Sequence, residues 1–195
     1  MEKEKGHEAI LAAVNPLLGR GVFVFLKVPE SWKLLKISIP PECNALGREF
    51  VGEGFRWITS GSIHALLVDE QKNQAYPFFL EVREFINDAQ AFEFIQKRFQ
   101  KLHNEESERV KIKPAYISDH EARCVIWVSR KKMFLKRKEV ALAHLECTTY
   151  CNLTKRLLLF RVSSSRVEDF MRDEEKMLSI LSSVTCHFSY VANSF

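Results

Sequence analysis

The chain has 195 residues, of which 46% are hydrophobic and 11% aromatic, including 15 phenylalanines. This supply of apolar side chains is enough for one sizeable core, so we expect a single domain over residues 1–195 and exclude long disordered segments. The formal net charge of +4, from 29 basic and 25 acidic residues, is far from the dense positive charge of dedicated nucleic-acid binders.

The N-terminal sequence and the cysteines bear on the cellular compartment. The apolar run at residues 9–14 is too short for a signal peptide and follows a charged stretch. No segment approaches the roughly 20 apolar residues that a membrane span needs. Five cysteines, an odd number at low density, are typical of a reducing compartment. We therefore predict a cytoplasmic location and no membrane span.

The first half of the chain is predicted to contain one helical extension, three strands and one long helix. We expect residues 1–19 to form an N-terminal helical extension, which Pro16 ends. Strands are predicted at 22–28, 62–68 and 76–85, with an irregular connection rich in proline and glycine between the first two. A helix is expected over 88–103, because Asn87 suits a helix cap and apolar residues recur at helical spacing behind it.

The second half is predicted to hold the centre of a sheet and the helix that covers it. After a strand at 110–117, three strand-like runs follow one another at 124–128, 140–147 and 156–162. Apolar residues with helical spacing predict a helix over 165–184. The sequence therefore predicts an α+β fold, an antiparallel β-sheet of six or more strands packed against two main helices.

Two local motifs and the order of the elements resemble the PsbP-like superfamily. The motifs are the strand that leads into Val28-Pro-Glu-Ser-Trp32 and the final helix that ends Leu178-Ser-Ile-Leu-Ser-Ser-Val184. This superfamily includes an extrinsic subunit of photosystem II and a Ran-binding nuclear import factor. The resemblance implies an α/β/α sandwich and a protein that binds other proteins without catalysing a reaction. It carries over no site residue.

A group of late cysteines and histidines has the ligand types of a zinc site: His144, Cys147, Cys151, Cys186 and His187. Alternation along a strand places Cys147 and Cys151 on one face and His144 on the other. The two cysteines would be about 13 Å apart at roughly 3.3 Å per residue, beyond the reach of a disulfide. We expect small buried residues here, and a metal site or a disulfide remains the alternative.

Two further candidates are a thiol nucleophile and a basic patch. Cys186 next to His187 has the residue types of a thiol enzyme, but chain neighbours rarely face each other.

The basic patch is predicted to be a hairpin tip, where charge keeps a sheet soluble, and it offers cations and one aromatic ring to phosphates or acidic surfaces. Its residues are Arg130, Lys131, Lys132, Phe134, Lys136, Arg137 and Lys138.

The sequence contains no glycine-rich phosphate loop, no zinc-protease helix and no nucleophile elbow. We therefore expect no catalytic residue and no cofactor. The predicted function is a non-catalytic protein-interaction or adaptor domain with a protein partner. The alternatives are a nucleic-acid or anion-binding protein that uses the 130–138 tip, and a metal-binding protein or thiol enzyme that uses the late cysteines and histidines.

Overall fold

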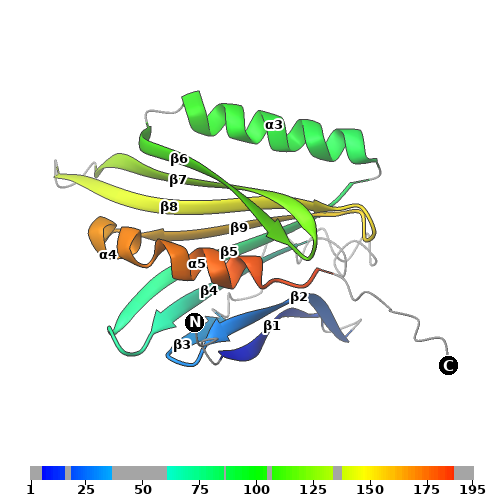
Figure 1. The fold of residues 1–195 in the computed structure, drawn as a ribbon, viewed down its shortest axis with the longest axis horizontal. Helices are drawn as coiled ribbons and strands as arrows, with labels where there is room; N and C mark the ends of the chain where they lie inside the picture. The colour runs from blue at the N-terminus through cyan, green and yellow to red at the C-terminus, as the bar shows by residue number, and fades with distance from the viewer. Residues whose placement is uncertain are drawn as a thin grey trace.

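The computed structural model describes residues 6–15, 19–36, 61–85, 87–104, 107–133 and 138–186. Seven of its strands form one antiparallel sheet (Figure 1). These strands are β3 (Trp32–Lys36), β4 (Gly61–Asp69), β5 (Gln74–Glu84), β6 (Ser107–Ile117), β7 (His120–Met133), β8 (Lys138–Cys151) and β9 (Arg156–Ser164). Their order across the sheet is β3-β4-β5-β9-β8-β7-β6. The predicted α+β fold with an antiparallel sheet is confirmed.

The three runs predicted between residues 124 and 162 lie in neighbouring strands of this sheet. They fall in β7, β8 and β9, with β8 paired to both of the others. Along β8 the side chains alternate between the two faces, so Leu145 and Cys147 join the main core while Glu146 faces the opposite side and contacts Arg98. Both faces of the central strands are therefore covered.

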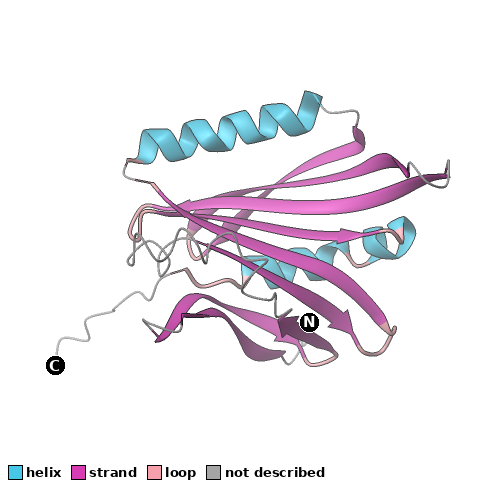
Figure 2. Cartoon of the chain, turned by 180° about the vertical axis from the view of Figure 1, so that it is seen from behind, coloured by secondary structure: helices cyan, strands magenta, loops and turns pink. Residues whose placement is uncertain are grey.

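Helices lie on both faces of the sheet (Figures 1 and 2). α3 (Asp88–Asn104) covers one face with Ala91, Ile95 and Leu102 buried against it. It begins after Asn87, whose side-chain oxygen accepts the Gln90 amide N–H at 2.8 Å, so the cap that the sequence predicts is present. α4 (Val167–Arg172) and α5 (Glu174–Ser182) cover the other face.

The closing helix is not continuous from 165 to 184 as predicted, because it is split at Asp173. This residue has φ −92° and ψ 4° and separates α4 from α5. Its buried carboxylate accepts a hydrogen bond of 2.8 Å from the Tyr76 hydroxyl and pairs with the Lys72 ammonium group. The described residues therefore contain three helices instead of two main ones, while the predicted apolar stripe is buried on both sides of the break, as Phe170, Met177 and Leu181.

The predicted helical extension at residues 1–19 is wrong for its described part. Residues Gly6–Asn15 form β1, which pairs along its whole length with β2 (Gly19–Pro29) as a separate two-stranded ribbon. Leu11 of β1 is 2% exposed. Pairing with β2 and burial of Leu11 outweigh the modest helix preference of the alanines in this segment. The predicted strand at 22–28 is confirmed as part of β2.

The main core lies between the sheet, the ribbon and the α4–α5 pair. Trp32 is fully buried there and stacks on Tyr76 at a centroid distance of 5.6 Å. The ribbon is tied to this layer by backbone hydrogen bonds between Phe25 and Thr185, which follows α5. None of the helices in the described part of the chain has the length and apolarity needed to cross a membrane.

Candidate functional site

Cys124 and Cys147 form a disulfide between the neighbouring strands β7 and β8. They are direct partners in the register, with their Cα atoms 4.1 Å apart. The sequence predicts a small buried residue at Cys147, with a metal site or a disulfide as the alternative; Cys147 is buried and its disulfide partner is Cys124, which the sequence pattern does not indicate. Predicting this pair requires the register between β7 and β8. That register depends on the length of the turn between the strands, which the sequence pattern does not determine.

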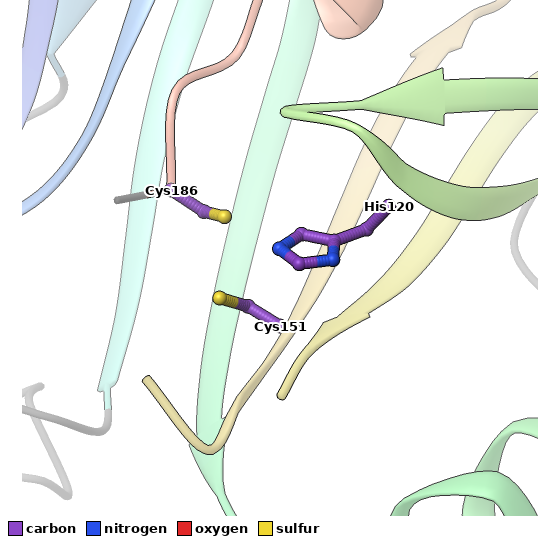
Figure 3. Close-up of side chains that lie close together, drawn as sticks. All are labelled: His120, Cys151 and Cys186. Atoms are coloured by element: carbon purple, nitrogen blue, oxygen red, sulfur yellow. The ribbon is translucent and has the colours of Figure 1, made fainter. Parts of the chain in front are cut away.

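A second cluster brings together His120, Cys151 and Cys186 (Figure 3). Their ligand atoms all lie within 4.8 Å of one another. His120 is the first residue of β7, Cys151 is the last residue of β8, and Cys186 follows α5. Both cysteines are buried and outside the disulfide, and His120 is half-buried. The sequence singled out the two cysteines, but not the histidine that faces them.

Hydrogen bonds from side chains to the backbone hold the segment at 184–186 beside the turn that carries His120. The Ser118 hydroxyl donates to the Val184 carbonyl at 2.6 Å, and its oxygen accepts the Cys186 amide N–H at 2.9 Å. Ser118 and Asp119 both have positive φ, 48° and 66°, so the turn between β6 and β7 is tight. The Arg156 guanidinium donates to the Cys186 carbonyl at 2.6 Å. Cys186 is therefore fixed from two sides.

The environment of Cys186 does not favour thiol catalysis. Burial, together with the charge and hydrogen bond of the nearby Cys151, raises the pKa of the Cys186 thiol to about 12. Hydrogen bonding from Ser118 and the charge of Arg156 act in the opposite direction but do not compensate. A thiol with a raised pKa is a poor nucleophile at neutral pH, because the thiolate is the reactive form.

Two other members of the predicted zinc group, His144 and Cys147, lie elsewhere. His144 stacks on Trp127 at 4.8 Å, and its Nε2 is 2.9 Å from the Ser129 hydroxyl. Cys147 is in the disulfide. His187 lies outside the described residues. Of the predicted group, the described residues keep Cys151 and Cys186 together, beside a different histidine, His120.

The basic patch lies at a hairpin, as the sequence predicts. Met133 at the end of β7 pairs with Lys138 at the start of β8, so residues 134–137 connect the two strands. Arg130 is exposed, and its Nη1 is 3.8 Å from Glu139. The backbones of Lys131 and Lys132 pair with β8. Phe134, Lys136 and Arg137 lie outside the described residues, and the binding role of the patch stays a prediction.

A groove of about 840 Å³ lies between α3, β6 and the ends of β7 and β8. Three of the five large hydrophobic side chains that are exposed among the described residues line it: Phe92 at 57%, Ile112 at 67% and Tyr116 at 64%. The sequence predicts a strand at 110–117 but no site there. Ile112, Pro114 and Tyr116 lie on one face of that strand because side chains alternate, and no pattern in the sequence indicates that α3 lies beside this face.

Polar groups of both signs surround the apolar side chains of the groove. Asp88 accepts hydrogen bonds of 2.8 Å from both the Tyr150 hydroxyl and the Lys155 ammonium group. The Arg123 guanidinium lies over the Phe99 ring at 5.9 Å. Of the Cys–His cluster, His120 also lines the groove. The groove thus combines aromatic anchors with a mixed polar rim.

Comparisons with known proteins support the fold alone. No protein-family model matches the sequence, and no curated protein matches it significantly in sequence. Among solved structures, the chain is similar to the crystal structure of LpqN, which is involved in cell envelope biogenesis of Mycobacterium tuberculosis. The TM-score is 0.51 with 15% identity, over 92% of this chain and 90% of LpqN. The two chains therefore share a fold over most of their lengths.

Proposed function

We propose that this protein is a non-catalytic protein-interaction domain that binds its partner in the groove between α3 and β6. The observation that carries this proposal is the concentration of exposed Phe92, Ile112 and Tyr116 at one groove. Large apolar side chains that gather on a surface mark interaction sites, and aromatic residues supply much of the binding energy of protein interfaces.

The chemistry of the groove suits a protein partner better than a nucleic acid. Its rim carries the carboxylates of Asp88, Asp119 and Glu121 and the guanidinium of Arg123. Phosphate recognition needs an excess of positive charge, whereas mixed charges around an apolar centre are typical of protein interfaces.

β6 is also an edge strand of the sheet, with β7 as its neighbour. An extended segment of a partner can add to such an edge, with its apolar side chains in the groove.

The test begins with the chain as bait in an extract of its native source, followed by mass spectrometry of the co-purified proteins. The decisive step is direct binding between the bait and each purified candidate. We expect the double variant Ile112→Ser/Tyr116→Ser to weaken binding at least tenfold. Leu35→Ser is the matched control, because Leu35 is 49% exposed on β3 at the opposite edge of the sheet. Equal affinity of both variants and the wild type would refute the groove as the binding surface.

The resemblance to the PsbP-like superfamily stays a proposal about the finer fold class. It is supported by the placement of α3 on one face of an antiparallel sheet and of α4 and α5 on the other. An experimental structure that superposes on PsbP-like proteins with the same strand order would test it. A different strand order would reject it.

A cytoplasmic location also stays a proposal, and the Cys124–Cys147 disulfide provides its test. Disulfides are rare in cytosolic proteins, except in hyperthermophiles. Thiols can be blocked at the moment of lysis of the native source and counted by mass spectrometry. Free Cys124 and Cys147 would support a reducing cytoplasm. A disulfide between them in a source that does not grow hot would oppose it.

A further inference from the structure

We propose that His120, Cys151 and Cys186 form a zinc-binding site. The three residues come from separate parts of the chain and are brought together at one end of the sheet (Figure 3). Two thiolate sulfurs and one imidazole nitrogen are a donor set that suits zinc rather than magnesium or calcium, which prefer oxygen ligands. This inference is independent of the groove function proposed above.

The distances in the cluster are close to those of a tetrahedral zinc site. With Zn–S of about 2.3 Å and Zn–N of about 2.0–2.1 Å, the ligand atoms of such a site lie about 3.5–3.8 Å apart. The ligand atoms of His120, Cys151 and Cys186 already lie within 4.8 Å of one another. The ligand atoms therefore need to approach one another by no more than about 1.3 Å to reach the spacing of a zinc site.

The backbone around the cluster is organised to hold the ligands in place. Ser118 hydrogen-bonds to Val184 and to Cys186, so the turn before His120 and the segment that carries Cys186 are joined directly. Thr185 is fixed from the other side, because its N–H donates to the Phe25 carbonyl at 2.7 Å. A site held by such supporting hydrogen bonds loses little conformational entropy when the metal binds.

The charges of the site balance when zinc is present. Binding removes the two thiol protons, so Zn²⁺ and two thiolates carry no net charge, and the imidazole remains neutral. The zinc would be bound to β7, to β8 and to the segment after α5 at once. The three ligands found among the described residues leave the fourth tetrahedral position for a further ligand.

The competing structure is a second disulfide between Cys151 and Cys186. In the described structure Cys124 and Cys147 are joined, while Cys151 and Cys186 are not in a disulfide and have a histidine beside them. A disulfide between the two cysteines does not involve His120, whereas the proposed metal site requires His120 as a ligand. The contribution of the histidine therefore distinguishes the two possibilities.

The experiment measures zinc in the full chain, expressed without an affinity tag in zinc-supplemented medium and purified under reducing conditions without chelators. We expect about one zinc per chain in the wild type by elemental analysis. Cys186→Ser and His120→Ala should each lower the zinc content at least tenfold after dialysis. His144→Ala is the matched control and should keep its zinc, because this histidine lies on Trp127 and Ser129 away from the cluster.

A second measurement covers the case in which a variant fails to fold. Cobalt added to the metal-free, folded wild type should produce visible d–d bands and a thiolate charge-transfer band, both abolished by excess zinc. The site is refuted if the folded wild type contains no zinc and gives no cobalt spectrum. It is also refuted if folded His120→Ala keeps its full zinc content. A separate metal-free preparation is purified without oxygen and without reductant. If Cys151 and Cys186 form a disulfide in this preparation, the pair belongs to the competing structure.

Discussion

Arg98 and Glu146 form a two-bond ion pair that joins α3 to the sheet. The Arg98 Nε and Nη2 atoms donate to Glu146 Oε1 and Oε2, each at 2.8 Å. Arg161 of β9 donates to the same carboxylate through its Nε at 2.9 Å. The Glu146 side chain is 0% exposed. A single buried carboxylate thus holds one arginine of the covering helix and one of the neighbouring strand.

Removing this carboxylate should destabilise the fold strongly. We expect Glu146→Ala to lower the free energy of unfolding by about 3 kcal/mol, because both arginines lose their buried counter-charge. Urea unfolding followed by circular dichroism measures the change. Lys97→Ala is the control on the same helix: its pair with Glu93 is exposed, so the change should stay within about 0.5 kcal/mol. Equal effects of the two variants would contradict the anchoring role of Glu146.

The same pair predicts how stability depends on pH. Burial alone would raise the pKa of Glu146, but the hydrogen bonds and charges of Arg98 and Arg161 outweigh it and hold this pKa below its usual value. A carboxylate with a lowered pKa in the folded state stabilises above its unfolded pKa of about 4.3 and loses this effect as the pH falls further. The difference in unfolding free energy between the wild type and Glu146→Gln should therefore be largest near neutral pH and shrink below about pH 4. Parallel curves for the two proteins would contradict this.

The disulfide should contribute measurably to stability. Cys124 and Cys147 are 23 positions apart in sequence, and closing a loop of this length stabilises by about 3 kcal/mol in the chain-entropy model. We expect Cys124→Ala/Cys147→Ala to lower the urea midpoint, and a reducing agent to lower it in the wild type but not in the double variant. A reducing agent that shifts neither midpoint would show that the pair is not oxidised in solution.

The parts of the fold that follow from local patterns were predictable from the sequence. α3 was predictable because Asn87 caps it and its apolar residues recur at helical spacing. Most of β4 and β5 and the runs at 124–128, 140–147 and 156–162 were predictable as strands from their composition. β1 was not, because its alanines carry no strand preference and only the pairing with β2 determines its conformation. The break at Asp173 depends on Tyr76 and Lys72, which lie about a hundred residues away in sequence.

The candidate sites were harder to predict for the same reason. Cys151 and Cys186 carried a chemical signal by residue type, but His120 joins them only through the ends of three separate elements. The Cys124–Cys147 pair depends on the register of β7 with β8. The groove depends on where α3 lies over β6, and no pattern within either element states this. These sites depend on long-range geometry, which residue type and local spacing do not determine.

The basic hairpin between β7 and β8 gives a prediction that separates a soluble tip from a nucleic-acid site. Arg130 is exposed and close to Glu139, and Lys131 and Lys132 lie near the tip of the hairpin formed by β7 and β8. We expect binding to a single-stranded oligonucleotide to be weak at moderate salt and little changed by Lys131→Gln/Lys136→Gln, because the charges of such a tip serve mainly to prevent sheet edges from pairing. Fluorescence anisotropy at two salt concentrations measures it. Tight binding that collapses between low and moderate salt and in the double variant would instead assign phosphate recognition to this hairpin, and would displace the groove as the main binding surface.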